Sequence, residues 1–92
     1  MALNAGVIGL GNIGGGVARN LVAAGHAVVG FDLDPDRITD AGAQEAVDAA
    51  EVAERSDMVV LAVASLPAWR ASLAAISASG RRGLIVVDLC TF

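Results

Sequence analysis

Three glycines near the amino end of the chain have a spacing that suits phosphate binding. Gly9, Gly11 and Gly14 fit the pattern G-x-G-x-x-G, between a short apolar run and a stretch with helical periodicity. Gly9 would permit a tight turn, Gly11 would let a pyrophosphate approach the backbone, and Gly14 would let a helix pack closely on a strand. The helix would then present free N–H groups and its positive dipole end to the phosphates. We therefore expect dinucleotide contacts from the loop residues Gly9, Leu10, Gly11, Asn12, Ile13 and Gly14.

An acidic residue follows at the distance that this kind of site requires. Asp32 lies 18 residues after Gly14 and closes a second apolar run. A carboxylate there can accept hydrogen bonds from the adenosine ribose, and its charge would repel the 2′-phosphate of NADP, so NAD is favoured over NADP. We expect Leu33 beside it at the cofactor. Arg37 could turn toward a 2′-phosphate, face solvent or pair with a nearby acid. The alternatives are a glycine turn without a ligand and a solvated acid.

The rest of the chain alternates between strand and helix patterns. Apolar runs predict strands, and stripes at helical spacing or caps such as Asp34-Pro35 and Asp48 with Glu51 predict the helices between them. This alternation predicts an α/β fold, a Rossmann-type doubly wound parallel sheet with helices on both faces, truncated after about five strands. The expected strands are Ala5–Ile8, Ala27–Phe31, Gln44–Ala46, Met58–Val63 and Leu84–Leu89, and the expected helices end near Ala24–Gly25, Gly42, Arg55 and Ser79.

Composition argues against several classes of protein. The net charge of −4 disfavours binding to nucleic acid. No apolar run reaches 18 residues and no basic leader opens the chain, so neither a membrane span nor a signal peptide is expected. A single cysteine and a single histidine exclude an internal disulfide and a His/Cys zinc site within these residues, so no metal is expected. The lone cysteine fits a reducing compartment, and we expect a cytoplasmic location.

The chain contains no lysine and no tyrosine, and its six positive side chains are all arginine. Arginine stays protonated, so it cannot transfer a proton as a base. No catalytic residue is therefore predicted within these 92 residues. His26 is expected at the edge of the sheet opposite the strands' carboxyl ends, in a structural role. Cys90 is expected as a small buried residue, Asp88 as a cap or loop anchor, and Trp69 in packing.

The stretch from Val7 to Asp32 resembles the β-hydroxyacid dehydrogenase family, which includes 3-hydroxyisobutyrate dehydrogenases, tartronate semialdehyde reductases and the related 6-phosphogluconate dehydrogenases. The glycine pattern fits the family, as do Ala18, Asn20-Leu21, Ala24-Gly25-His26, Ser56-Asp57 and the closing VVDLCT. The resemblance implies hydride transfer between a nicotinamide and a small 3-hydroxy acid or semialdehyde. It also implies a longer nucleotide-binding domain and a helical domain with a catalytic lysine, so we expect residues 1–92 to be the amino-terminal part of the cofactor domain.

The resemblance adds site residues at two further strand ends. In the family a Leu-Pro pair after the fourth strand contacts the cofactor, and those positions are Val63 and Ala64 here, followed by Ser65. The family's Asp-x-Ser-Thr reads Asp88-Leu89-Cys90-Thr91, which implies that Thr91 lies near the nicotinamide. Ser65 and Thr91 have turn or cap roles as equal alternatives.

Two other functions stay open from the sequence. One is a dinucleotide-sensing module without catalysis, complete as given, which the absence of lysine favours. The other is the cofactor domain of an imine reductase-like enzyme. The fifth strand would lack a covering helix, so we expect another copy of the chain, and hence a homo-oligomer, or another protein to cover it. The expected partners are the dinucleotide and, in the full enzyme, a small hydroxy acid.

Overall fold

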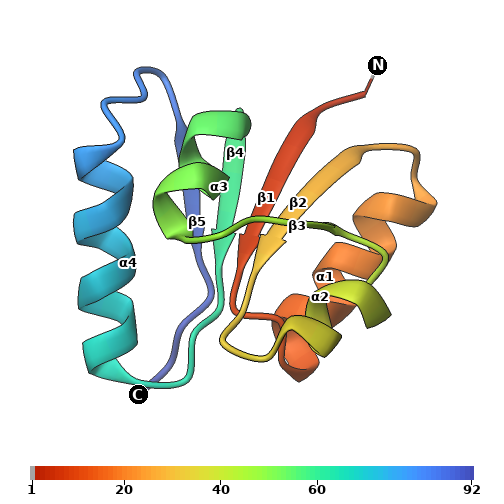
Figure 1. Ribbon diagram of the computed structural model, residues 1–92, viewed down its shortest axis with the longest axis horizontal. Helices are drawn as coiled ribbons and strands as arrows, with labels where there is room; N and C mark the ends of the chain where they lie inside the picture. Colours follow the sequence, from red (N-terminus) through yellow and green to blue (C-terminus); the bar gives the residue numbers. More distant parts are fainter. Residues whose placement is uncertain (1) are drawn as a thin grey trace.

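The computed structural model describes residues 2–92, which form five strands and four helices in alternation (Figure 1). This alternation is the one that the apolar runs and helical stripes predict. The strands are β1 (Asn4–Ile8), β2 (Ala27–Phe31), β3 (Gln44–Glu45), β4 (Met58–Leu61) and β5 (Ile85–Asp88). The helices are α1 (Asn12–Ala23), α2 (Pro35–Asp40), α3 (Ala49–Arg55) and α4 (Leu66–Ala78). Within residues 2–92 no helix is long and apolar enough to cross a membrane.

The strands form one parallel sheet in the order β3-β2-β1-β4-β5. From β1 the chain first builds outward through β2 and β3, then returns to the other side of β1 to add β4 and β5. The strand order therefore reverses at β1, as in the doubly wound dinucleotide-binding folds. This confirms the predicted Rossmann-type α/β class, and it places the carboxyl ends of β1, β2 and β4 side by side.

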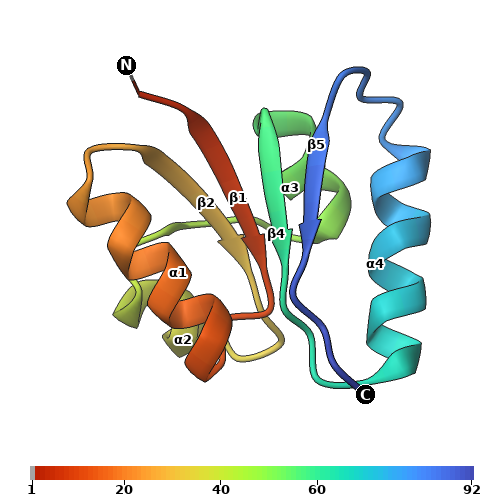
Figure 2. The same cartoon turned by 180° about the vertical axis from the view of Figure 1, so that it is seen from behind.

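Helices cover both faces of the sheet, but not evenly. α1 and α2 lie on one face over β1 and β2, and α3 and α4 lie on the other (Figure 1). Successive residues of a strand point to opposite faces, so Val60 joins the core cluster on the side of α1 and α2, while Val59 and Leu61 join the cluster on the side of α3 and α4. Seen from behind, β4 and β5 have no helix over them (Figure 2). All four residues of β5 are exposed, because this face has no covering helix and β5 is the edge strand of the sheet.

Three of the four helices begin at a side-chain cap. Asp34 accepts a hydrogen bond from the N–H of Asp36 at 3.1 Å. Asp48 accepts one from Glu51 at 2.8 Å, and the Glu51 carboxylate returns to the N–H of Val47 at 2.8 Å. Both predicted caps are confirmed; each contributes about 1 kcal/mol to its short helix.

The strand ends differ from the sequence prediction by one or two residues. β4 ends at Leu61 rather than Val63, because its partner β1 ends at Ile8, where Gly9 turns the chain away. β5 is Ile85–Asp88 rather than Leu84–Leu89, since it pairs only along β4. β3 lacks the expected Ala46 because only Val29 and Gly30 of β2 pair with it. β1 begins one residue earlier than predicted. The length of each strand is thus set by pairing with its neighbour. An apolar run in the sequence does not indicate how far that pairing extends.

We expect two glycine-to-alanine substitutions to shift stability in opposite directions. A Cβ at Gly6 on β1 would lie 2.5 Å from the Ser56 Oγ and closer still to Val52, so Gly6→Ala should lower the free energy of unfolding by about 1–3 kcal/mol. Gly16 lies inside α1, where a Cβ would meet no atom within 4 Å beyond the local helix backbone, so Gly16→Ala should raise the free energy of unfolding by about 0.5–1 kcal/mol. Urea unfolding monitored by circular dichroism measures both. A Gly6→Ala domain as stable as the parent would contradict this description of the packing.

Candidate dinucleotide-binding site

Three backbone segments meet at the carboxyl end of β1 without a side chain between them. Gly9 has a φ of +89°, which L-residues rarely adopt, and a Cβ there would lie 2.5 Å from the carbonyl oxygen of Ala62 beyond β4. A Cβ at Gly14 would overlap the carbonyl oxygen of Gly9. The turn and the close packing of α1 on β1 therefore both require glycine, as the spacing predicts.

Gly11 is different, because the folded chain does not need a glycine there. A Cβ at Gly11 would have only the Arg37 Nη1 within 4 Å, at 3.9 Å, and its φ of −72° suits any residue. Gly11 precedes α1, whose amino end has no side-chain cap and no acid in its first turn. The first N–H groups of a helix have no partner within it and carry partial positive charge. Open space over Gly11 and uncapped N–H groups fit a phosphate.

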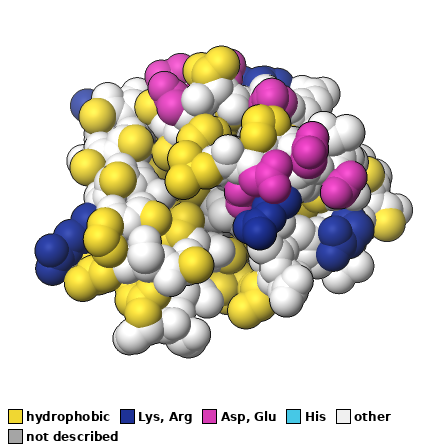
Figure 3. Space-filling view, turned by 60° about the horizontal axis from the view of Figure 1, so that its bottom comes forward, with side chains coloured by type: hydrophobic (Ala, Val, Ile, Leu, Met, Phe, Trp, Pro, Cys, Tyr) yellow, Lys and Arg dark blue, Asp and Glu magenta, His cyan; other side chains and the backbone are white. Residues whose placement is uncertain are grey.

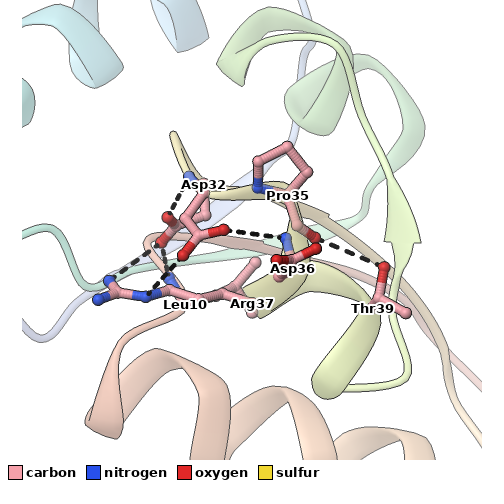
Figure 4. Close-up of polar contacts among 7 residues, drawn as sticks. Leu10, Asp32, Pro35, Asp36, Arg37 and Thr39 are labelled. Carbon is pink, nitrogen blue, oxygen red and sulfur yellow. Dashed lines mark hydrogen bonds and ion pairs between the residues drawn. The ribbon is translucent and has the colours of Figure 1, made fainter.

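Asp32 ties the glycine loop to the end of β2. Its Oδ2 accepts a hydrogen bond from the N–H of Leu10 at 2.8 Å, and its Oδ1 accepts one from Asp34 at 2.8 Å (Figure 4). Only 11% of the Asp32 side chain is exposed. Each carboxylate oxygen keeps a second lone pair, so these two bonds leave acceptor capacity for a ligand hydroxyl.

Arg37 lies over the same carboxylates. Its Nη1 is 4.0 Å from Asp32 Oδ2 and its Nε is 3.9 Å from Asp34 Oδ2 (Figure 4). Of the orientations left open by the sequence, the structure has the one that pairs Arg37 with acids. More than half of the Arg37 side chain is exposed, and pairs of this length at a surface contribute about 0–1 kcal/mol. The guanidinium is therefore free to move when a charged ligand arrives.

A cleft of about 670 Å³ opens between the ends of these strands and the amino ends of α3 and α4. Figure 3 looks toward this edge of the molecule, where hydrophobic side chains are most frequent on the left and a group of acidic and basic side chains lies on the right. The cleft is large enough for part of a dinucleotide. It brings together eight of the residues that the sequence analysis selected: Gly9, Gly11, Asp32, Leu33, Arg37, Val63, Ala64 and Ser65.

The other five lie outside the cleft. Leu10 has a buried side chain, and its N–H is bound by Asp32. Asn12 lines a second cavity of about 320 Å³, while Ile13 is 60% exposed. Gly14 lies beneath the loop, and Thr91 is exposed in the segment after β5.

Small residues on two helices complete the cleft wall and were missed by the sequence analysis. Ala49 begins α3, and Ala68, Ala71 and Ser72 lie in the first half of α4. Their spacing along α4 places them on one helical face, and that run of small side chains was the available signal. Ser65 caps α4, because its Oγ accepts a hydrogen bond from Ala68 at 3.2 Å, which leaves its hydroxyl hydrogen free for a ligand.

Three further titratable side chains, those of His26, Asp88 and Cys90, make contacts within the fold. His26 lies at the opposite edge of the sheet, where its Nδ1 accepts a hydrogen bond from the Leu3 N–H at 2.9 Å. The Cys90 N–H, and then the Trp69 indole, hold the pKa of Asp88 below its ordinary value. Cys90 is half-buried rather than buried as expected, because the strand beside it has an uncovered face. Desolvation is the main cause that raises the pKa of its thiol, so the thiol stays protonated at neutral pH. Residues 2–92 contain no group of three or more His, Cys, Asp or Glu placed to hold a metal ion.

Comparison with known proteins agrees with this geometry. The chain is 45% identical over 58 residues to the probable mitochondrial 3-hydroxyisobutyrate dehydrogenase of Dictyostelium discoideum, covering 60% of the chain and 18% of that protein. It is 44% identical over 66 residues to L-threonate dehydrogenase of Cupriavidus necator, covering 68% and 22%. The chain thus spans about a fifth of the length of these two relatives.

Solved structures share the fold over nearly the whole chain. The Mycobacterium tuberculosis 3-hydroxyisobutyrate dehydrogenase with L-serine superposes with a TM-score of 0.86 at 28% identity, covering 96% of this chain and 31% of that one. An imine reductase variant from Myxococcus stipitatus with NAD+ reaches a TM-score of 0.87 at 22% identity, covering 100% and 33%. At that identity the reductase shows a shared fold alone.

A match to a known domain family covers the same elements. The family is described as the NAD binding domain of 6-phosphogluconate dehydrogenase, and the match runs over residues 4–92. It includes the glycine loop, Asp32, the cleft and all five strands. The chain therefore belongs to the family of NAD-binding domains typified by that of 6-phosphogluconate dehydrogenase.

Proposed function

We propose that this chain binds NAD as the cofactor domain of a hydroxyacid dehydrogenase. The proposal rests mainly on the amino end of α1, which has no side-chain cap and lies below the open space at Gly11. The Asp32 carboxylate lies at the rim of the same cleft. In this proposal the α1 N–H groups bind the pyrophosphate. Asp32 accepts hydrogen bonds from the adenosine ribose, and the small residues of α4 face the adenosine.

Asp32 and Asp34 support NAD rather than NADP as the preferred cofactor. Both carboxylates lie where the adenosine ribose would bind, and a 2′-phosphate there would meet two like charges. Arg37 would favour NADP, because its exposed guanidinium could pair with the 2′-phosphate. It would have to leave both acids to do so, and their charges would remain beside the phosphate. The balance of charge therefore favours NAD.

The bound nicotinamide would supply the hydride chemistry. The names of the relatives from Dictyostelium discoideum and Cupriavidus necator support a small hydroxy acid as the substrate class. This chain has no lysine or tyrosine, so a proton-transferring group of either type would come from residues outside these 92. A homo-oligomer agrees with the uncovered face of β5. The cytoplasmic location is also part of the proposal and rests on the single cysteine, whereas the Dictyostelium discoideum relative is named mitochondrial.

We expect Gly11→Ala to weaken NAD binding without unfolding the domain. The folded chain has room for the methyl group, but the pyrophosphate would occupy that room. An overpacked contact costs about 1–3 kcal/mol, which corresponds to about 5- to 160-fold in affinity. Calorimetric titration with NAD+ measures the affinity, and urea unfolding measures stability. Gly16→Ala is the matched control, because it adds a methyl group to the same helix away from the loop. Unchanged NAD+ affinity in Gly11→Ala would argue against a pyrophosphate at this position.

We expect the chain to bind NAD+ more tightly than NADP+. Asp32→Asn should reduce the ratio of the two affinities about tenfold, because it removes one of the two carboxylate charges that would face the 2′-phosphate. The amide nitrogen cannot accept one of the two backbone hydrogen bonds, so stability should also fall by about 1–3 kcal/mol. Parallel titrations with both dinucleotides give the ratio. Glu54→Gln also removes one negative charge, at an exposed position on α3 away from the cleft, and should leave the ratio unchanged. Tighter binding of NADP+ by the unmodified chain would overturn the proposed preference.

A further inference from the structure

A cluster at the carboxyl end of β5 ties the chain after that strand to helix α4. The Trp69 Nε1 on α4 donates a hydrogen bond to Asp88 Oδ2 at 2.9 Å, and the Cys90 N–H donates to Asp88 Oδ1 at 2.9 Å. The Trp69 and Phe92 rings meet edge to face, with 6.4 Å between centroids. Figures 1 and 2 both show the carboxyl terminus beside the first turn of α4.

Asp88 is the centre of this cluster, although it is exposed. Both of its oxygens bind protein N–H groups, one from the indole and one from the backbone. Asp88 is ionised at neutral pH, and hydrogen bonds to an ionised acceptor are the stronger kind. The same two donors hold the pKa of Asp88 below its ordinary value. The backbone of Leu89 adds a bond to the Leu61 carbonyl at 2.9 Å. The segment from Leu89 to Phe92 is therefore fixed to both β4 and α4.

This segment lies on the side of the site away from Asp32. In the sheet, β5 is next to β4, and β2 lies beyond β1 on the other side. With the adenosine half at Asp32 and the pyrophosphate at the loop after β1, the nicotinamide half extends toward the ends of β4 and β5. Thr91 lies between two residues that the cluster holds, Cys90 and Phe92.

We propose that Trp69 and Asp88 are positioning residues for the nicotinamide half of the cofactor. Their hydrogen bond sets the course of Cys90–Phe92 and so the place of Thr91, while the adenosine half is bound independently by the glycine loop and Asp32. This inference rests on the proposed function, because it assumes that a dinucleotide occupies the cleft. The inference assigns the two halves of the cofactor to separate parts of the chain. A ligand that lacks the nicotinamide therefore separates the contribution of one part from that of the other.

The test compares NAD+ with ADP-ribose, which retains the adenosine, the pyrophosphate and the second ribose but lacks the nicotinamide. Trp69→Phe keeps an aromatic ring for packing and removes the Nε1 donor, and it changes the sole tryptophan of the chain. Calorimetric titration of the full chain should show NAD+ bound about three- to tenfold more weakly and ADP-ribose within about twofold of the parent value. Asp88→Asn, which loses an acceptor for one of the two donors, should give the same pattern. Ser77→Ala, exposed at the far end of α4, should change neither affinity.

Each outcome has a definite meaning. Equal weakening of both ligands in Trp69→Phe and Asp88→Asn would overturn the inference, because the cluster would then only support the fold. Unchanged NAD+ affinity in both variants would overturn it as well. If Trp69→Phe does not fold by circular dichroism, Asp88→Asn alone decides, since an exposed substitution of equal size leaves the core unchanged. Failure of the parent chain to bind ADP-ribose would instead refute the proposed function.

Discussion

The contact between the Gly9 carbonyl and Gly14 is the constraint on which the site depends. There the end of β1 and the first turn of α1 touch backbone to backbone, and the chain beyond β4 closes on Gly9 from the other side. A side chain at either glycine would separate these segments. Because they stay in contact, the uncapped end of α1 points into the crevice where the strand order reverses. The position of the proposed phosphate site is thus a consequence of steric exclusion.

Asp32 connects this loop to the rest of the cleft. A buried or half-buried carboxylate needs hydrogen-bond donors, and it finds them in the N–H groups of Leu10 and Asp34. The loop after β1 and the turn after β2 are therefore held at a fixed separation before any ligand arrives. Pre-organisation of this kind reduces the ordering cost of binding. The residue that would recognise the ribose also shapes the site around it.

The β2 side and the β5 side of the sheet differ in how their strands are covered. On the β2 side, helices cover the strands, and polar groups gather at the rim of the cleft. On the β5 side, one face of the strand is open, and the chain beyond it is held by Trp69 and Asp88 instead of by a helix over that face. The hydrogen bonds of the exposed Asp88 carboxylate thus hold the chain in place here, whereas packed side chains hold it elsewhere in the fold.

The sequence by itself determined the order of the elements, the glycine loop, Asp32 and two of the caps, because each depends on residues close together in the chain. Glycine spacing, apolar runs and the Asp34 and Asp48 caps are local signals, and the structure has them where the patterns predict. Only the tertiary structure decided the strand ends and the bond from Trp69 to Asp88. These depend on which strand lies beside which, and on residues 19 positions apart meeting across two elements. No local pattern reports such pairings, because they arise when the sheet assembles.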